Sequence, residues 1–252
     1  MGWVWILVLN AALLGGAYLA SISWFRQPRG LPRVLAGSVL AWTWVTLGEQ
    51  ILGSLGAIAR PSLLGWALLG LGLAVVGRYV RPAPDWPQEP SSAALRWDFA
   101  SLLALGLVLW VVLVLGTPSL MLPLKVVSDG PIYHLYFAVR WWKSGALELI
   151  PTPFGETAAT YFPANGELWF LWLLAGLGGD TLAKVGQAPF LLLTGLASYA
   201  LARELRAGPS ASLISACWLL ACVPLVLFSF EPNVDTFVVA GYLVSLVFLV
   251  RF

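Results

Sequence analysis

Long apolar runs without charge alternate along this chain with short clusters of charged residues. No Asp, Glu, Lys or Arg occurs in residues 1–25, 61–77, 99–124 or 207–230, and the run 34–59 contains only Glu49. A helix needs roughly 20 apolar residues to cross the hydrocarbon core of a bilayer. The pattern therefore predicts seven membrane-spanning helices, at residues 3–23, 34–56, 61–78, 99–117, 182–202, 209–229 and 234–250.

One further apolar segment, 168–179, is too short to fit this scheme. Only these twelve residues separate Glu167 from Asp180. As a helix they would extend about 18 Å, against a hydrocarbon core of about 30 Å. We therefore expect a half-helix that lies at the outer face and does not span.

The distribution of basic residues gives an independent test of this topology, because Lys and Arg are enriched in cytoplasmic loops. With the N-terminus outside and 168–179 not spanning, nine of the 14 basic residues are cytoplasmic and five are outside. If 168–179 spans, the split becomes seven to seven and the bias disappears. The nine are Arg26, Arg29, Arg33, Arg78, Arg81, Arg96, Arg203, Arg206 and Arg251.

This topology places the long loop 118–181 and the short loop 230–235 on the same side of the membrane. Asp129 and Asp235 can then share one extracytoplasmic site. Within the long loop, Ser128-Asp129-Gly130-Pro131 has the residue types of a helix start. The apolar positions that follow recur at helical spacing, which predicts an amphipathic helix on the membrane surface; they are Ile132, Leu135, Tyr136, Val139 and Trp142.

Composition agrees with a polytopic, all-α transmembrane helix bundle. Hydrophobic residues make up 60% of the chain and charged residues 10%, whereas soluble domains carry about 25% charged residues. We expect a multi-pass protein of the cell membrane with lipids as partners. The net charge of +2 is too small to indicate a nucleic-acid partner, and one His without a CxxC motif does not indicate a zinc site.

Five short motifs follow one another along the chain. They are Ser128–His134, Tyr161-Phe162-Pro163, Gly176–Asp180, Ala202–Arg206 and Glu231–Phe237. In this order the chain resembles the GT-C superfamily of membrane glycosyltransferases, specifically the protein O-mannosyltransferase and lipid A aminoarabinose transferase branches. The resemblance covers about 97–252 and leaves 1–96 as three additional N-terminal helices. It also implies further spans beyond Phe252, so we expect the chain to be truncated at its C-terminus.

The resemblance implies a glycosyltransferase that uses a polyprenyl-phosphate-linked sugar and transfers the sugar at the extracytoplasmic face. It makes Asp129 the candidate catalytic base and Asp235 a second catalytic carboxylate, with a divalent metal ion bound by both as a candidate cofactor. The candidate substrate-binding residues are Tyr133, His134, Arg140, Lys143 and Tyr161.

Simpler interpretations of these residues stay open. Asp129 and Asp235 are also suited to helix N-caps, His134 to an ordinary interfacial position, and Arg140 and Lys143 to contacts with headgroups. Glu167 reads most simply as a solvated loop charge, and Glu49 as a helix-packing residue. Two other functions stay open as well: a multi-pass transporter, and a non-catalytic membrane assembly subunit.

Overall fold

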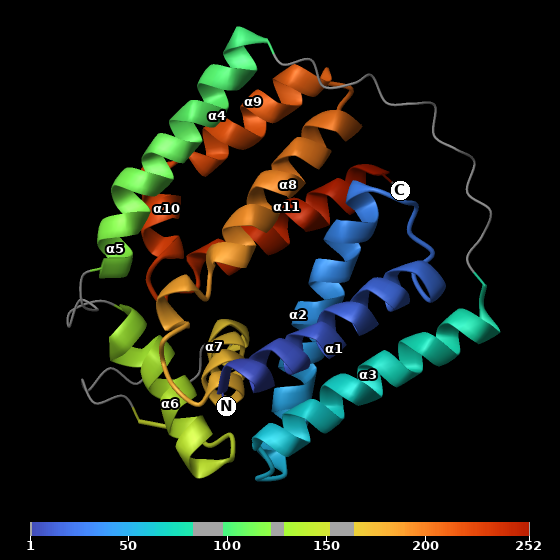
Figure 1. Ribbon diagram of the computed structural model, residues 1–252, viewed down its shortest axis with the longest axis vertical. Helices are drawn as coiled ribbons and strands as arrows, with labels where there is room; N and C mark the ends of the chain where they lie inside the picture. Colours follow the sequence, from blue (N-terminus) through green and yellow to red (C-terminus); the bar gives the residue numbers. More distant parts are fainter. Residues whose placement is uncertain (1, 83–97, 122–128, 152–163, 252) are drawn as a thin grey trace.

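The computed structural model describes residues 2–82, 98–121, 129–151 and 164–251 (Figure 1). Every regular element within these ranges is a helix, which confirms the all-α prediction. The larger helices are α1 (Gly2–Ser23), α2 (Leu31–Ser54), α3 (Arg60–Val80), α4 (Phe99–Val111), α6 (Leu135–Ser144), α7 (Asn165–Leu177), α8 (Ala188–Glu204), α9 (Pro209–Leu220), α10 (Val223–Ser229) and α11 (Asp235–Arg251). The shorter ones are η1 (Val112–Gly116), α5 (Thr117–Met121), η2 (Gly130–His134) and η4 (Ala183–Val185).

Four helical segments in the described ranges are long and apolar enough to cross a bilayer. They are Gly2–Ser23, Arg60–Val80, Phe99–Gly116 and Ala183–Glu204, and the bent pair α9–α10 makes a fifth if it counts as one span. Helix α2 has sufficient length but is less apolar, and α11 has 17 residues. The structure therefore supports a multi-pass membrane protein with four or five candidate spans.

The region predicted as one span at 209–229 is two helices. Helices α9 and α10 meet at an angle of 64°. Pro224 explains the position of the break, because proline has no N–H to donate and its ring clashes with the carbonyl four residues earlier. That carbonyl belongs to Leu220, the last residue of α9.

The N-terminal helices α1, α2 and α3 form a compact group (Figure 1). Helices α1 and α3 lie side by side because small residues occupy their interface. A Cβ built on Gly16 would be only 3.0 Å from the backbone nitrogen of Leu71. Helices α8, α9 and α11 form a second group, in which α8 packs against both of the others.

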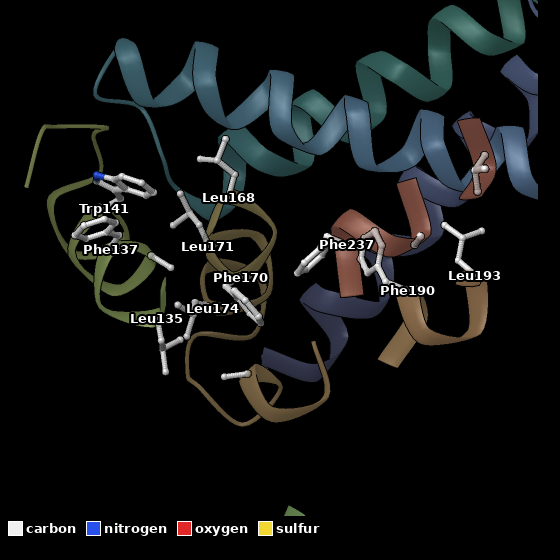
Figure 2. Packing of buried hydrophobic residues seen from close by; sticks show 14 of the residues in the cluster. Leu135, Phe137, Trp141, Leu168, Phe170, Leu171, Leu174, Phe190, Leu193 and Phe237 are labelled. Atoms are coloured by element: carbon white, nitrogen blue, oxygen red, sulfur yellow. The ribbon is translucent and has the colours of Figure 1, made fainter. Parts of the chain in front are cut away.

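Helix α7 joins these two groups and is buried along nearly its whole length. Phe170 and Leu174 pack into a cluster with α6, α8 and α11, while Trp172 and Ala175 pack against α1, α2 and α3. Figure 2 shows Phe170 beside Phe237, with Leu168, Leu171 and Leu174 between that pair and α6. At 13 residues, about 20 Å, α7 has the length expected of a half-helix. Other helices surround α7, so the ends of this short helix are not exposed to lipid, where free backbone N–H and C=O groups would be unfavourable.

Helix α6 is amphipathic, but its buried face differs from the predicted stripe. Phe137, Ala138 and Trp141 are buried, whereas the stripe residues Val139 and Trp142 are half-buried. The difference arises because α7 lies against the 134–137–138–141 face. The predicted stripe is the adjoining face of the helix, and its contact with a membrane surface stays a prediction.

Candidate functional site

Three segments that are distant in sequence meet at one place: η2, the first turn of α7, and the loop before α11. Two glycines allow the close approach. A Cβ on Gly130 would lie 2.7 Å from Cγ of Pro232, and a Cβ on Gly166 would lie 2.3 Å from Cγ1 of Val234. Larger residues at 130 and 166 would push these segments apart. We call this meeting point the three-segment site.

Gln187, which directly precedes α8, fixes the loop that carries Asp235. Its side chain is completely buried. The Nε2 group donates to the carbonyls of Phe228 at 2.6 Å and Glu231 at 3.0 Å, and the Oε1 atom accepts from the backbone N–H of Thr236 at 3.0 Å. One amide side chain therefore holds both ends of the loop and satisfies a free N–H in the first turn of α11.

His134 and Glu167 form a buried pair at the centre of the site. The distance from Nδ1 of His134 to Oε1 of Glu167 is 2.5 Å, and the two residues are 5% and 4% exposed. The second carboxylate oxygen, Oε2, is buried and has no hydrogen-bond partner among the described residues. The interpretation of Glu167 as a solvated loop charge is therefore wrong. The first turn of α7 carries this residue inward, where its position on the helix directs it to His134.

Asp129, Tyr133 and Asp235 lie around this pair. The Tyr133 ring packs on His134 at a centroid distance of 4.1 Å, and its hydroxyl hydrogen-bonds Asp129. Burial, followed by the hydrogen bond to Asp129 and the negative charges of Asp129, Glu167 and Asp235, raises the pKa of Tyr133 to about 12. The phenol thus stays protonated at neutral pH and can donate a hydrogen bond.

Both predicted catalytic aspartates are exposed at this place. Asp129 occupies the N-cap position of η2, where it has helical backbone angles and its side chain makes no capping hydrogen bond. Asp235 begins α11 and acts on the same tyrosine. Asp129 and Asp235 thus both contribute negative charge at Tyr133, and their shared catalytic role stays a prediction.

The predicted cationic residues lie elsewhere on α6. Arg140 and Lys143 are exposed, and Lys143 is nine residues beyond His134, about 13 Å along the helix. Arg140 lies 3.9 Å from the carboxylate of Glu148. The remaining candidate, Tyr161, lies outside the described residues.

The site offers carboxylates, an imidazole and a phenol, but no complete metal-binding set in its described part. No group of three or more His, Cys, Asp and Glu side chains in the described ranges is arranged to hold a metal ion. Asp129 and Asp235 remain the candidate metal ligands predicted from the sequence.

The chemical capacity of the site is proton transfer and hydrogen bonding. Because Nδ1 of His134 faces a carboxylate, the partner fixes the tautomer and orientation of the ring and leaves Nε2 for another group, as in carboxylate–histidine pairs of other sites.

A scan against protein-family models, a search of curated proteins and a search of solved structures each found no match.

Proposed function

We propose that the chain is a membrane glycosyltransferase that uses a polyprenyl-phosphate-linked sugar as donor. The acceptor receives the sugar at the extracytoplasmic face of the cell membrane. The observation that supports this proposal is the three-segment site, where two exposed aspartates surround a buried His–Glu pair and a protonated tyrosine. The proposal also uses the seven-span topology, with the N-terminus and the site outside.

In the proposed reaction, the bond between sugar C1 and the donor phosphate oxygen breaks, and polyprenyl phosphate leaves with the electron pair. The acceptor hydroxyl or amine attacks C1, where positive charge develops as in glycoside cleavage. Asp129 accepts the proton that the acceptor loses. Asp235 adds negative charge near the developing positive centre.

The remaining residues have supporting roles. Glu167 orients His134, and Tyr133 donates a hydrogen bond at the edge of the site. Arg140 and Lys143 are exposed on α6, where cations suit the phosphate of a lipid-linked donor at the membrane surface. Tyr161 keeps its role as a candidate contact to the substrate.

The test compares Asp129→Asn with Asp180→Asn in membrane vesicles. Each is given radiolabelled polyprenyl-phosphate-linked hexoses and pentoses, with the membrane fraction as the acceptor pool. We expect Asp129→Asn to insert normally and to lose transfer by about 10²–10⁴-fold, the usual contribution of a general base. Asp180 is an exposed carboxylate outside the site, so its variant should keep transfer. Full transfer by Asp129→Asn would count against the proposal.

A transporter is the second candidate function, and the bent pair α9–α10 is the observation that favours it, because broken helices mark many transporter sites. Cysteine labelling from outside discriminates between the two. In a background with Cys217 and Cys222 replaced by Ala, we expect Asp129→Cys and Asp235→Cys to react and Glu204→Cys not to. Protection of either position 129 or position 235 would favour the transporter or a non-catalytic subunit.

A further inference from the structure

A cavity of about 380 Å³ lies within the N-terminal group of helices, and none of its lining residues belongs to the three-segment site. Its walls come from α1, α2 and α3, and small residues create the space: Gly16, Ala17, Ala20, Ala67, Gly70 and Ala74. The volume lies in the range of about 300–1,000 Å³ that is typical of small-molecule sites. The lining side chains are apolar throughout, so the site suits a hydrocarbon ligand.

Two tryptophans, Trp24 and Trp44, line this cavity. Trp44 of α2 stacks on Trp66 of α3 at 4.6 Å, and each indole donates to the backbone carbonyl of the other residue. Trp24, at the turn after α1, contacts Gly77 and donates to the carbonyl of Leu73 at 3.4 Å. Helices α2 and α3 thus meet at the Trp44 end and are separated by the cavity elsewhere, while α1 packs along both.

The length of the cavity matches half a bilayer. The lining residues of α1 and of the turn after it run from Leu13 to Trp24, and the eleven steps between them correspond to about 16 Å at the helical rise. The hydrocarbon core is about 30 Å thick, so one leaflet contributes about 15 Å. A single acyl chain from one leaflet fits this length, whereas a polyprenyl chain is much longer than the cavity.

Positive charge surrounds the Trp24 end. The Arg81 guanidinium lies 5.1 Å from the Trp24 ring centroid, and Arg33 is buried beside Tyr18 at 5.8 Å. Residues 20–35 and 74–82 contain five Arg, at positions 26, 29, 33, 78 and 81, and no Asp or Glu. A guanidinium stacked on an aromatic ring keeps its edge N–H groups for a phosphate. The charge at this end is therefore complementary to an anionic headgroup.

We propose that this cavity binds one acyl chain of an anionic phospholipid, whose phosphate lies near Arg81 at the Trp24 end. The site would retain one lipid when the surrounding bilayer is removed. This inference is independent of the proposed glycosyl transfer, because it involves none of the residues of the three-segment site.

Native mass spectrometry of the full chain in mild detergent tests the proposal. The delipidated protein is titrated with phosphatidylglycerol and with phosphatidylcholine of the same acyl chains. We expect one phosphatidylglycerol per chain, bound about tenfold more tightly than phosphatidylcholine, a difference within reach of one charge-assisted contact. Equal retention of the two lipids would overturn the headgroup assignment and the proposal with it.

Matched variants locate the bound chain. Ala20→Leu fills the cavity from α1, and Ala11→Leu makes the same change on the exposed face of the same helix. We expect Ala20→Leu to weaken phosphatidylglycerol binding about tenfold, because it removes space for several methylene groups, and Ala11→Leu to leave binding unchanged. Leu40→Phe fills the cavity from α2 and provides the same test if Ala20→Leu does not fold.

Charge variants locate the headgroup. Arg81→Gln should reduce phosphatidylglycerol binding to the level of phosphatidylcholine, while Arg206→Gln, at an exposed position after α8, should keep the preference. Unchanged binding in both cavity variants, or the same loss in Ala11→Leu, would refute the site. Displacement of phosphatidylglycerol by equimolar polyprenyl phosphate would also refute it, because the occupant would then be the longer lipid.

Discussion

Glu49 in α2 and Glu167 in α7 are both buried glutamates, but within the described residues only Glu167 has a hydrogen-bond partner. One oxygen of Glu167 contacts His134, whereas neither oxygen of Glu49 has a hydrogen-bond partner among the described residues. Glu49 belongs to an otherwise apolar group of helices, and Glu167 lies where three segments bring two aspartates and a tyrosine together. Burial of a carboxylate therefore does not by itself indicate a functional site. The polar side chains around the carboxylate are the better indicator.

The largest expected effect concerns the residue that holds the three-segment site together. Gln187→Leu removes three buried hydrogen bonds. It leaves the N–H of Thr236 without its partner, while the carbonyls of Phe228 and Glu231 keep the backbone N–H groups of Glu231 and Asn233 as donors. Each unsatisfied buried group costs about 1–3 kcal/mol. We expect a loss of roughly 3–5 kcal/mol in the free energy of unfolding, measured by thermal unfolding in detergent micelles. Gln50→Leu, on the exposed side of α2, should change stability little, and an equal loss in both variants would contradict this role.

The next largest effect is expected when Glu167 is removed from its pair with His134. Glu167→Leu leaves His134 buried without its partner and should lower the free energy of unfolding by about 1–3 kcal/mol. The double variant His134→Leu/Glu167→Leu should recover part of that loss, because it removes both polar groups. Additive losses in this double-mutant cycle would show that the two side chains are not coupled.

The same substitution at the other glutamate should have the opposite sign. Glu49→Leu replaces a buried carboxyl group that has no hydrogen-bond partner by an apolar group of similar size. We expect stability to rise by about 1 kcal/mol, since burying an unpartnered polar group is unfavourable. A drop in stability would show that Glu49 has a partner, and loss of transfer at unchanged stability would make it a functional residue.

The raised pKa of Tyr133 gives a pH-dependent prediction. Because the folded state keeps this phenol protonated up to about pH 12 while the unfolded state releases the proton near 10, stability should be constant below pH 10 and fall between pH 10 and 12. Tyr133→Phe should show a smaller fall in the thermal midpoint over that window. The same alkaline decline in wild type and variant would assign it to other groups.

The smallest effect is expected at the exposed end of α6. Arg140 and Glu148 are both about half exposed and lie 3.9 Å apart. Exposed ion pairs of this kind contribute about 0–1 kcal/mol. Arg140→Gln should therefore leave stability almost unchanged, and any loss of glycosyl transfer in this variant would report on donor binding rather than folding. A large drop in thermal midpoint would show that Arg140 has contacts beyond Glu148.

Hydrophobic patterning predicted the helical class and the positions of most helices, because long apolar runs leave few alternatives in a membrane. It also predicted that 168–179 forms a short helix. The break at Pro224 was missed, although the residue is visible in the sequence, because the apolar run continues through it. Patterning cannot show which neighbour a helix contacts, so the buried face of α6 was predicted one residue away from the true one.

Asp129 and Asp235 were predicted to share a site, since both adjoin predicted spans and the charge bias places both loops on one side, and their joint role stays a prediction. Glu167 and Gln187 were missed as site residues. For Glu167 a signal existed: it is the single charged residue in the first turn of an otherwise apolar helix, opposite the single histidine of the chain. Gln187 acts only through three-dimensional contacts with residues more than 40 positions away, and no local pattern reports that.

Arg60 shows that residues 1–96 help to stabilise α7, a role that the order of the motifs does not predict. From the first turn of α3, its Nε donates to the carbonyl of Ala175 at 3.0 Å, at the C-terminal end of α7. A cation there balances the partial negative charge of the helix end. The opposite end of α7 carries Glu167. A protein shortened to residue 97 onward would lose Arg60 at the C-terminal end of α7 and the packing of α7 against α1, α2 and α3, and α7 would still have to bury Glu167.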